Sequence, residues 1–427
     1  MAHLTVRSAY KNLVDRLNRF PQGAPPSELL YKILEILFTK EEAEFVANLS
    51  IKPFTLEKAA NLTRRTKKET EALLNKLSSK GILLDAEING ETFYTLPPPM
   101  AGFFEFSMMR IRDDIDQKVL AEMFYEYLNV EEDFIKELFI NCETKLGRVF
   151  INERAIEYES ALNVLDYERA SEVIKTATHI GVGVCYCRHK MEHLGKACDA
   201  PMEICMTFNS VADSLIRHNI AKQKSVSECM NLLDTAYENN LVQFGENVRE
   251  KVSFICNCCG CCCEALLAAK RFGFLNPVHT TNYLPLIDEE KCNGCGKCVE
   301  VCPVEAMSLI SANEPKKKKL KKATLNEEIC IGCGLCVRAC NNNGLKMIER
   351  SQQVITPVNS VHRVVLAAIE KGKLQNLIFD NHVLWNHRAM AAVLGVILKL
   401  PPIKQTIASR QFKSRYLERL ITNYSGN

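Results

Sequence analysis

The stretch CNGCGKCVEVCP, residues 292–303, decides how this chain is organised, together with a second stretch, CIGCGLCVRAC, residues 330–340. Both runs separate four cysteines by two, two and three residues. This spacing curls a loop so that the first three thiolates converge, and we expect the fourth cysteine to open a helix and to point at another centre. Glycines in each run suit a backbone that wraps closely around a metal centre. The doubled pattern predicts two metal centres, each completed by a cysteine of the other run.

This register resembles the two-cluster ferredoxins of bacteria. The resemblance implies two [4Fe–4S] clusters. It assigns Cys292, Cys295, Cys298 and Cys340 to a first ferredoxin set, and Cys302, Cys330, Cys333 and Cys336 to a second ferredoxin set. Asn341 stands where the family usually has proline, which restores a backbone N–H near the sulfur and removes no ligand. Zinc is the alternative for any four cysteines, and eight in this doubled register argue against it.

The composition is that of a globular chain. Its 427 residues predict about three folded units, and 47% hydrophobic with 25% charged residues exclude a disordered or fibrous chain. The net charge of +3 makes no whole-protein case for nucleic acid or an anionic membrane, so any such binding is local.

Cysteine usage indicates the compartment. The chain has 20 cysteines, of which only Cys142 precedes residue 185 and none follows Cys340. Residues 1–23 lack the apolar region of a signal peptide, and the longest apolar stretch, Ala389–Leu398, is too short to span a bilayer. We therefore expect a reducing cytoplasm, where closely spaced thiols are metal ligands rather than disulfides.

Residues 1–99 predict helices followed by a hairpin. The expected helices are Glu28–Phe38, Glu41–Leu49, Leu56–Leu62 and Lys67–Ser79, and the expected strands are Ile82–Ile88 and Glu91–Leu96. Asn89-Gly90 suits a type I′ turn between the strands. The order resembles the winged helix-turn-helix domains of bacterial transcription regulators. Residues 58–80 carry a local charge of +5, which suits either phosphate contacts with DNA or a solvated helix in a domain used for protein contacts.

A middle region holds ten clustered cysteines. Cys185, Cys187, Cys198 and Cys205 form a C-x-C-x10-C-x6-C set directly after the strand-like Ile180–Val184. The set resembles a cysteine-rich module found upstream of ferredoxin domains in anaerobic iron–sulfur proteins, which implies a further cluster; zinc and unliganded thiols are the alternatives. Arg188 and His189 are expected either to position a cluster or an anion, or to lie solvated at the surface.

The run CNCCGCCC, residues 256–263, places six thiols in eight residues before the helical Glu264–Lys270. One cubane cannot take all six, so we expect Cys256, Cys258, Cys259, Cys261, Cys262 and Cys263 to divide between sites or to join the 185–205 set. The CCG element also resembles heterodisulfide-reductase-like proteins, although the downstream Cys-x2-Cys is already committed to the ferredoxin pattern. A redox-active dithiol is a further alternative. Cys142 and Cys229 are expected in the core.

These regions predict an α+β multidomain chain. It comprises a winged-helix-like domain (1–99), a helical connector (100–175), a mixed α/β cysteine-rich domain (176–288), a two-[4Fe–4S] ferredoxin domain (289–350) and a helical C-terminal region (351–427). Six lysines in 315–322 predict an exposed loop that suits docking of an acidic partner, and basic residues in 399–419 suit peripheral membrane contact or packing.

The pattern predicts low-potential electron transfer by a multicluster iron–sulfur protein, as a module or subunit of an anaerobic oxidoreductase system with a redox protein partner. No GxGxxG or P-loop is present, so a partner supplies any nicotinamide, flavin or ATP chemistry. The alternatives are an iron–sulfur redox-sensing transcription regulator that binds DNA, and a reductase with a catalytic middle cluster.

Overall fold

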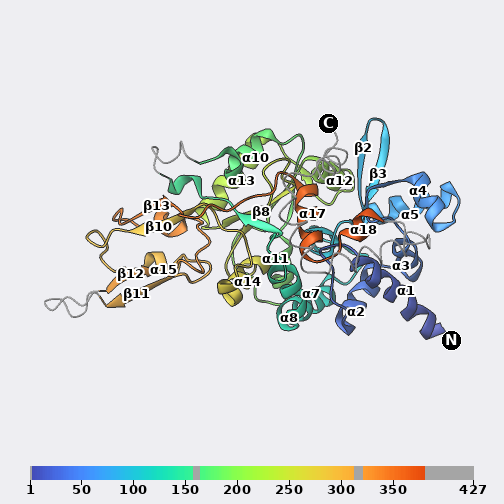
Figure 1. Ribbon diagram of the computed structural model, residues 1–427, viewed down its shortest axis with the longest axis horizontal. Helices are drawn as coiled ribbons and strands as arrows, with labels where there is room; N and C mark the ends of the chain where they lie inside the picture. The colour runs from blue at the N-terminus through green and yellow to red at the C-terminus, as the bar shows by residue number, and fades with distance from the viewer. Residues whose placement is uncertain (1, 157–163, 312–320, 380–427) are drawn as a thin grey trace. The chain divides into compact units, whose positions relative to one another are not determined.

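The computed structural model describes residues 2–156, 164–311 and 321–379 (Figure 1). The chain divides into two compact units. The first comprises residues 1–144, 210–222 and 358–427, and the second comprises residues 145–209 and 223–357. Both helices and sheets are present, so the chain is of mixed α/β content. Within the described residues, no helix combines the length and apolar character needed to cross a membrane.

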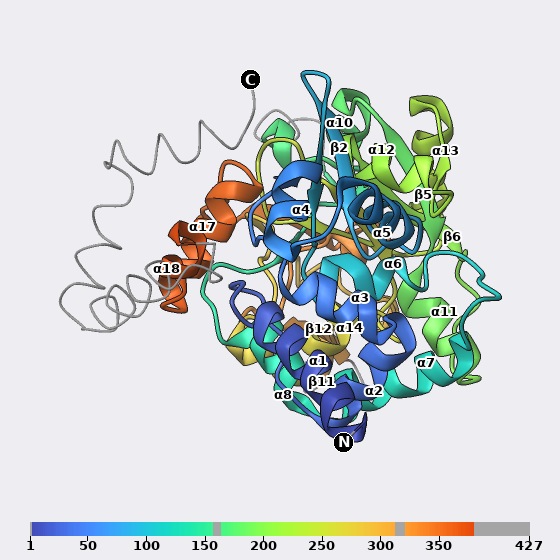
Figure 2. The same cartoon turned by 90° about the vertical axis from the view of Figure 1, so that its right-hand side faces the viewer.

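The first unit begins with the predicted helices and hairpin, preceded by a helix that the pattern did not indicate. The elements are α1 (Ala2–Leu17), α2 (Glu28–Leu37), α3 (Lys40–Ala47), β1 (Phe54–Thr55), α4 (Leu56–Thr63), α5 (Lys67–Ser79), β2 (Leu84–Ile88) and β3 (Glu91–Thr95). The strands form an antiparallel sheet in the order β1-β3-β2, whose hairpin projects from the helices in Figure 2.

Local sequence signals explain these boundaries. Ser27, Thr39, Thr55 and Thr66 each accept a hydrogen bond from a backbone N–H in the first turn of their helix. At the hairpin, Asn89 and Gly90 have φ values of 53° and 79°, as a type I′ turn requires.

The rest of the first unit is largely helical. It contains α6 (Phe104–Phe106), α7 (Gln117–Tyr125), α8 (Glu132–Ile135), most of α12 (Asn209–Arg217), α17 (Ser360–Glu370) and α18 (Leu374–Ile378), with the π-helical turns η1 (Pro99–Phe103), η2 (Glu126–Val130) and η3 (Lys136–Ile140). Cys142 lies in the core, as predicted, and its thiol contacts the Glu370 carboxylate at 2.7 Å. Burial and that carboxylate raise the pKa of Cys142 to about 12, so this thiol stays protonated.

A six-stranded sheet organises the second unit, and its strands β4, β8, β9, β6 and β5 pair antiparallel. Its strand order is β4-β8-β9-β6-β5-β7. The strands are β4 (Gly147–Val149), β5 (Ile180–Val184), β6 (Glu203–Phe208), β7 (Lys222–Gln223), β8 (Val242–Glu246) and β9 (Phe254–Cys258). Helices α10 (Ala170–Thr176) and α13 (Val226–Glu238) pack side by side on it, and Cys229 is fully buried in that core, as predicted. Strand β4 corrects the prediction of a purely helical connector, because a three-residue edge strand leaves too short a pattern to detect.

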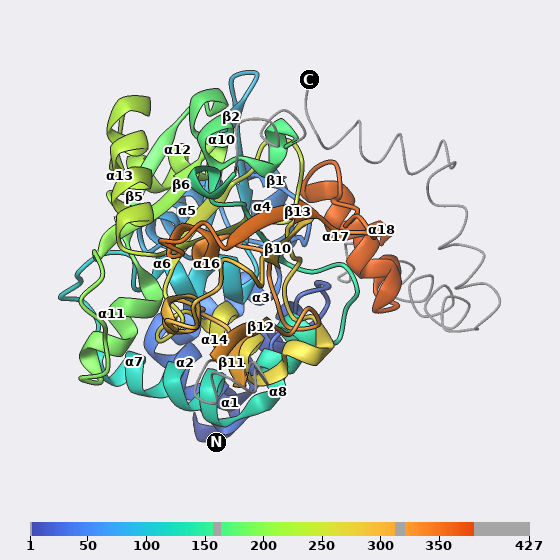
Figure 3. The same cartoon turned by 90° about the vertical axis from the view of Figure 1, so that its left-hand side faces the viewer.

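Two further helices and two two-stranded sheets complete the second unit. The helices α11 (Tyr186–His193) and α14 (Glu264–Phe272) each begin directly after a cysteine, and short 3-10 turns lie at η4 (Glu153–Ala155), η5 (Asp166–Glu168) and η6 (Gly273–Leu275). Strand β10 (Tyr283–Ile287) pairs with β13 (Leu345–Glu349), and β11 (Met307–Ser311) pairs with β12 (Lys321–Leu325). Figure 3 shows these strands with α14 and the short helix α16 (Leu335–Arg338), and Figure 1 shows the short helix α15 (Lys297–Glu300).

Two sequence predictions concern the lysine-rich stretch and the C-terminal region. Lys321 and Lys322 belong to β12 and not to an exposed loop, because their backbone groups pair with β11. Residues 315–320, the apolar stretch 389–398 and the basic residues of 399–419 lie outside the described residues. The predicted helix over 361–371 is confirmed as α17.

Candidate metal centres

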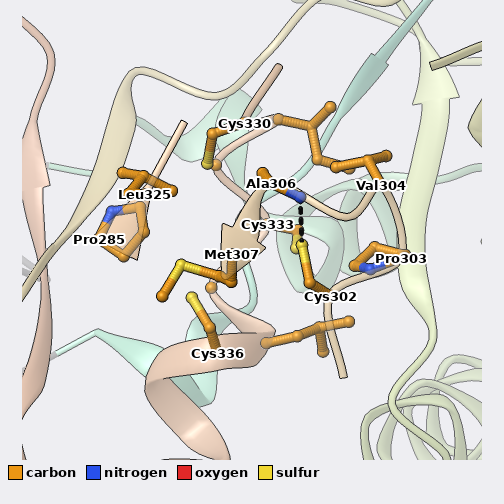
Figure 4. Close-up of a pocket in the computed structure, with 14 residues that line it drawn as sticks. Pro285, Cys302, Pro303, Val304, Ala306, Met307, Leu325, Cys330, Cys333 and Cys336 are labelled. Atoms are coloured by element: carbon orange, nitrogen blue, oxygen red, sulfur yellow. Dashed lines mark hydrogen bonds between the residues drawn. The ribbon is translucent and has the colours of Figure 1, made fainter. Parts of the chain in front are cut away.

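The eight ferredoxin cysteines surround two cavities in the second unit. The first cavity is lined by Cys292, Cys295, Cys298 and Cys340, and the second by Cys302, Cys330, Cys333 and Cys336. Figure 4 shows the second cavity, with its four sulfurs directed inward. These are the two groups that the sequence pattern predicts, each with three cysteines from one run and one from the other.

Glycines let the main chain fold tightly around these cavities. Gly294 has a φ of 71°, and an added Cβ would lie 2.1 Å from the Lys321 carbonyl oxygen. Gly332 has a φ of 70°, and its added Cβ would lie 2.4 Å from the carbonyl oxygen of Tyr283. A side chain at either position would clash with backbone, so both runs require glycine there.

Backbone amides point at cysteine sulfurs in both sets. The N–H groups of Ala323 and Gly344 donate to the sulfurs of Cys292 and Cys340 at 3.4 and 3.3 Å. In the second set, the Ala306 N–H donates to Cys302 at 3.1 Å (Figure 4). Amide donors of this kind stabilise thiolate ligands, so the donor set and its surroundings fit [4Fe–4S] clusters.

The two ferredoxin sets differ in exposure. In the first set Cys295 is exposed and Cys298 is buried, whereas the second set has two buried members, Cys330 and Cys336, and no exposed one. Burial raises the pKa of Cys330 to about 11 and also raises that of Cys336. The second set therefore lies in the drier environment, where additional negative charge is less favourable.

One local expectation about these runs is wrong. The fourth cysteine does not open a helix: Cys298 and Cys336, the third of each run, lie inside α15 and α16, and the fourth follows each helix end. The helices begin after Gly296 and Gly334, both with a φ of 84°, because this backbone turn directs the chain into the helix.

Strand pairing assembles the middle cysteines. Gly183 of β5 pairs with Cys205 of β6, and Met206 pairs with Ile255 of β9, which places Cys205 beside Cys256. Cys256 and Cys258 share one face of β9 because successive side chains alternate. Cys185 and Cys263 stand at the starts of α11 and α14, so strands β6 and β9 and the starts of two helices contribute thiols.

Six of these thiols form a continuous series, here called the six-thiol chain. Its members contact one another in the order Cys185, Cys187, Cys263, Cys258, Cys256 and Cys205. Hydrogen bonding from neighbouring thiols lowers the pKa of Cys185, Cys256 and Cys263, whereas the pKa of Cys187 and Cys258 is raised. The direction of the pKa shift thus alternates along the first five members of the chain.

The other four middle thiols form a separate four-thiol group. Cys198, Cys259, Cys261 and Cys262 place their sulfurs within 4.8 Å of one another. Cys198 therefore leaves the C-x-C-x10-C-x6-C set in which the sequence placed it. The reason is tertiary, because residue 198 lies in the loop before β6 and meets the turn after β9.

Arg188 lies between the two thiol assemblies. It is 1% exposed, so the surface alternative is wrong for this residue, and its guanidinium donates to the carbonyl oxygens of Pro201 and Asn257, at 2.6 Å each. Negative charge at Cys185 and Cys259 outweighs burial and raises the pKa of Arg188. The guanidinium thus supplies a fixed positive charge to both assemblies.

Lys190 and Glu264 lie at the site, although no sequence pattern indicated a role for either residue. They form a fully buried ion pair between α11 and α14. Helix α11 carries Cys187, and helix α14 begins directly after Cys263. His189 is also buried, at 5% exposed, beside His193. The only sequence signal for these buried groups was the charged run Arg188-His189-Lys190 directly after two cysteines. A solvent-exposed helix would carry the same run, so the signal does not predict burial.

The middle run contacts the second ferredoxin set. An added Cβ on Gly260 would lie 2.5 Å from the Pro303 carbonyl oxygen, next to Cys302. Lys270 of α14 also pairs with Glu305 at 2.8 Å. The turn 259–262, which carries three cysteines of the four-thiol group described above, and helix α14 therefore lie beside the second ferredoxin set within one unit.

Comparisons with known proteins support the ferredoxin part of this description. The family described as the 4Fe-4S dicluster domain matches residues 291–352. Ferredoxin-2 of Desulfomicrobium norvegicum (strain DSM 1741 / NCIMB 8310) is 56% identical over 27 residues, which cover 6% of this chain and 46% of that protein. The chain thus matches less than half of the length of this curated relative. No solved structure matches the chain.

Proposed function

We propose that this protein transfers electrons at low potential as a multicluster iron–sulfur module or subunit of an anaerobic oxidoreductase system. The observation that carries the proposal is the pair of cavities, each lined by four cysteines from both ferredoxin runs. The 4Fe-4S dicluster match at residues 291–352 supports it. The first ferredoxin set would hold one [4Fe–4S] cluster and the second set another, and each cluster supplies one-electron chemistry when bound.

The protein's own groups favour electron exchange at the first set. Exposed Cys295 brings that cavity close to solvent, and Lys322 donates to the Cys292 carbonyl oxygen at 2.9 Å. Lys322 and Lys291, the second of which lines this cavity, give basic surroundings that suit an acidic redox partner. The second set, buried beside the middle run, suits exchange within the protein.

The six-thiol chain is proposed to hold at least one further iron–sulfur cluster. Its six cysteines exceed the four ligands of a cubane, and its members extend over strands β6 and β9 and the starts of α11 and α14 instead of surrounding a point. Soft thiolates in this number suit a polynuclear iron site. Cys263 of this chain precedes α14, whose Lys270 pairs with Glu305, three residues after Cys302, and this contact supports electron exchange with the second ferredoxin set.

The DNA-binding alternative rests on the basic residues around α5. Several of them are engaged inside the first unit: Arg65 with Glu41 at 2.7 Å, Lys67 with Glu57 at 3.3 Å, and Lys76 and Lys80 with Glu42 at 3.0 and 2.7 Å. These pairs reduce the charge available for phosphate contacts, so we favour electron transfer. Retardation of a duplex at low salt, abolished by neutralising Arg64, Arg65, Lys67 and Lys68, would favour the regulator.

Metal analysis of the anaerobically purified full chain tests the proposal. We expect at least eight iron and eight acid-labile sulfide from the two ferredoxin sets, with EPR signals of reduced [4Fe–4S] clusters. Cys187→Ala and Cys258→Ala should each lower the iron and sulfide content below that of the wild-type protein. Cys229→Ala, in the core, should leave both contents unchanged. Fewer than eight iron, or zinc without sulfide at the ferredoxin sets, would refute electron transfer. Turnover of a substrate that depends on Cys187 would instead favour the reductase alternative.

A further inference from the structure

The four-thiol group has the spacing of a single-ion site. The sulfur–sulfur distances are 3.5 Å for Cys198–Cys259, 3.7 Å for Cys261–Cys262 and 3.9 Å for Cys198–Cys262. Thiolates at the corners of a tetrahedron around one zinc, with bonds of about 2.3 Å, lie about 3.8 Å apart. In a four-iron cluster each thiolate binds a different iron, so its sulfurs stand farther apart. The measured spacing therefore fits one ion.

The ferredoxin sets provide an internal comparison. Among the described residues, only the four-thiol group brings three or more cysteine, histidine or carboxylate ligand atoms within 4.8 Å of one another. The eight ferredoxin cysteines instead line cavities. The same chain thus holds thiols at two spacings, and the narrower one belongs to Cys198 and the turn 259–262.

Buried groups hold the two segments of this site together. Arg188 donates to Pro201, three residues after Cys198, and to Asn257, two residues before Cys259. Its Nε is buried and has no hydrogen-bond partner among the described residues, and its guanidinium also contacts the Cys259 thiol. A divalent ion with four thiolates carries a charge of about −2, which this cation partly offsets.

We propose that Cys198, Cys259, Cys261 and Cys262 bind one tetrahedral zinc ion, separate from every iron–sulfur cluster. Four sulfur ligands in a tetrahedron select zinc or iron, and zinc binds such sites more tightly than ferrous iron. Four protein ligands leave no open position, so the ion is structural and fixes the turn after β9 against the loop after α11. This inference does not depend on electron transfer.

The first measurement is the zinc content of the anaerobically purified full chain. We expect one zinc per chain, lost in a Cys261→Ser, Cys262→Ser double variant without change in iron, sulfide or ferredoxin EPR. Cys142→Ser is the matched control, since a serine hydroxyl can still donate to Glu370, and it should keep the zinc. A loss of about four iron with sulfide in the double variant would show a cubane there and overturn the proposal.

A cobalt measurement covers the case in which the double variant does not fold. After the wild-type protein is stripped with a chelator, Co²⁺ should give the intense visible bands of a tetrahedral thiolate site. The single variant Cys261→Ser, at an exposed position, should weaken the sulfur-to-cobalt absorption. Weak absorption bands typical of octahedral Co²⁺ would refute the site. Wild-type protein that contains neither zinc nor iron without sulfide would also refute it. One iron per chain without sulfide at this site would support the single-ion geometry and would show that the bound metal is iron instead of zinc.

Discussion

Gly260 and Pro303 join the middle cysteine run to the second ferredoxin set by direct backbone contact. An added Cβ on Gly260 would lie 2.5 Å from the Pro303 carbonyl oxygen and 2.9 Å from its Cα. Neither atom belongs to a flexible side chain, so a larger residue must displace the backbone that precedes Val304 and follows Cys302. The connection between the two metal regions thus requires the absence of a side chain at residue 260.

Gly260→Ala should therefore destabilise the second ferredoxin site. Overpacking costs about 1–3 kcal/mol, and we expect faster loss of the second cluster's EPR signal on heating. Gly344→Ala is the control, because its added Cβ would lie no closer than 3.4 Å to any atom. Equal loss of both cluster signals in Gly260→Ala would contradict the assigned contact.

The crossed ligand sets give a second prediction. Cys340 belongs to the second run but lines the first cavity, so Cys340→Ser should alter the same EPR signal as Cys298→Ser. Cys302→Ser should alter the signal that Cys333→Ser alters. The ligand assignment fails if Cys340→Ser and Cys333→Ser change one and the same cluster.

A third prediction concerns reduction potentials. Reduction adds negative charge, which burial disfavours and a nearby cation favours, so the first cluster should have the higher potential. Lys322→Met removes the ammonium beside Cys292 and should lower that potential by tens of millivolts, as measured by an EPR-monitored redox titration. Lys175→Met, on α10, should leave both potentials unchanged. A shift confined to the second cluster would contradict this account.

Asp85 gives a stability prediction for the first unit. Its carboxylate accepts from Ser214 and Arg217 at 2.6 Å each and lies 3.1 Å from His218. Burial alone would raise the pKa of Asp85, but hydrogen bonds from these partners lower it below its usual range. Asp85→Asn should cost about 2 kcal/mol, because hydrogen bonds between charged groups are lost.

The pH dependence of this contribution has a definite sign. Because the folded pKa is below the unfolded value, the stabilisation is complete above the unfolded pKa and declines as pH falls below about 4. Far-UV circular dichroism should show a lower melting temperature for the variant at pH 7. Melting at the wild-type temperature at pH 7 would show that the Asp85 contacts contribute nothing.

Much of the local structure follows from the sequence because it depends on short-range chemistry. Capping threonines and the Asn89-Gly90 turn determine where helices and the hairpin begin and end. The x2, x2 spacing predicted that the first three cysteines of each run converge, because a loop of that length curls around one centre. These features need no information from distant residues, whereas the crossed fourth ligand was implied by the resemblance to two-cluster ferredoxins.

The division of the ten middle cysteines was decided by tertiary structure. Cys185, Cys187, Cys198 and Cys205 are close in sequence, yet pairing of β6 with β9 moves Cys205 beside Cys256 and leaves Cys198 to meet the turn 259–262. The burial of Arg188 between the thiols follows from the same pairing. Spacing constrains only neighbours along the chain, whereas contacts between strands depend on which edges pair, and that choice is made by the packing of the whole sheet.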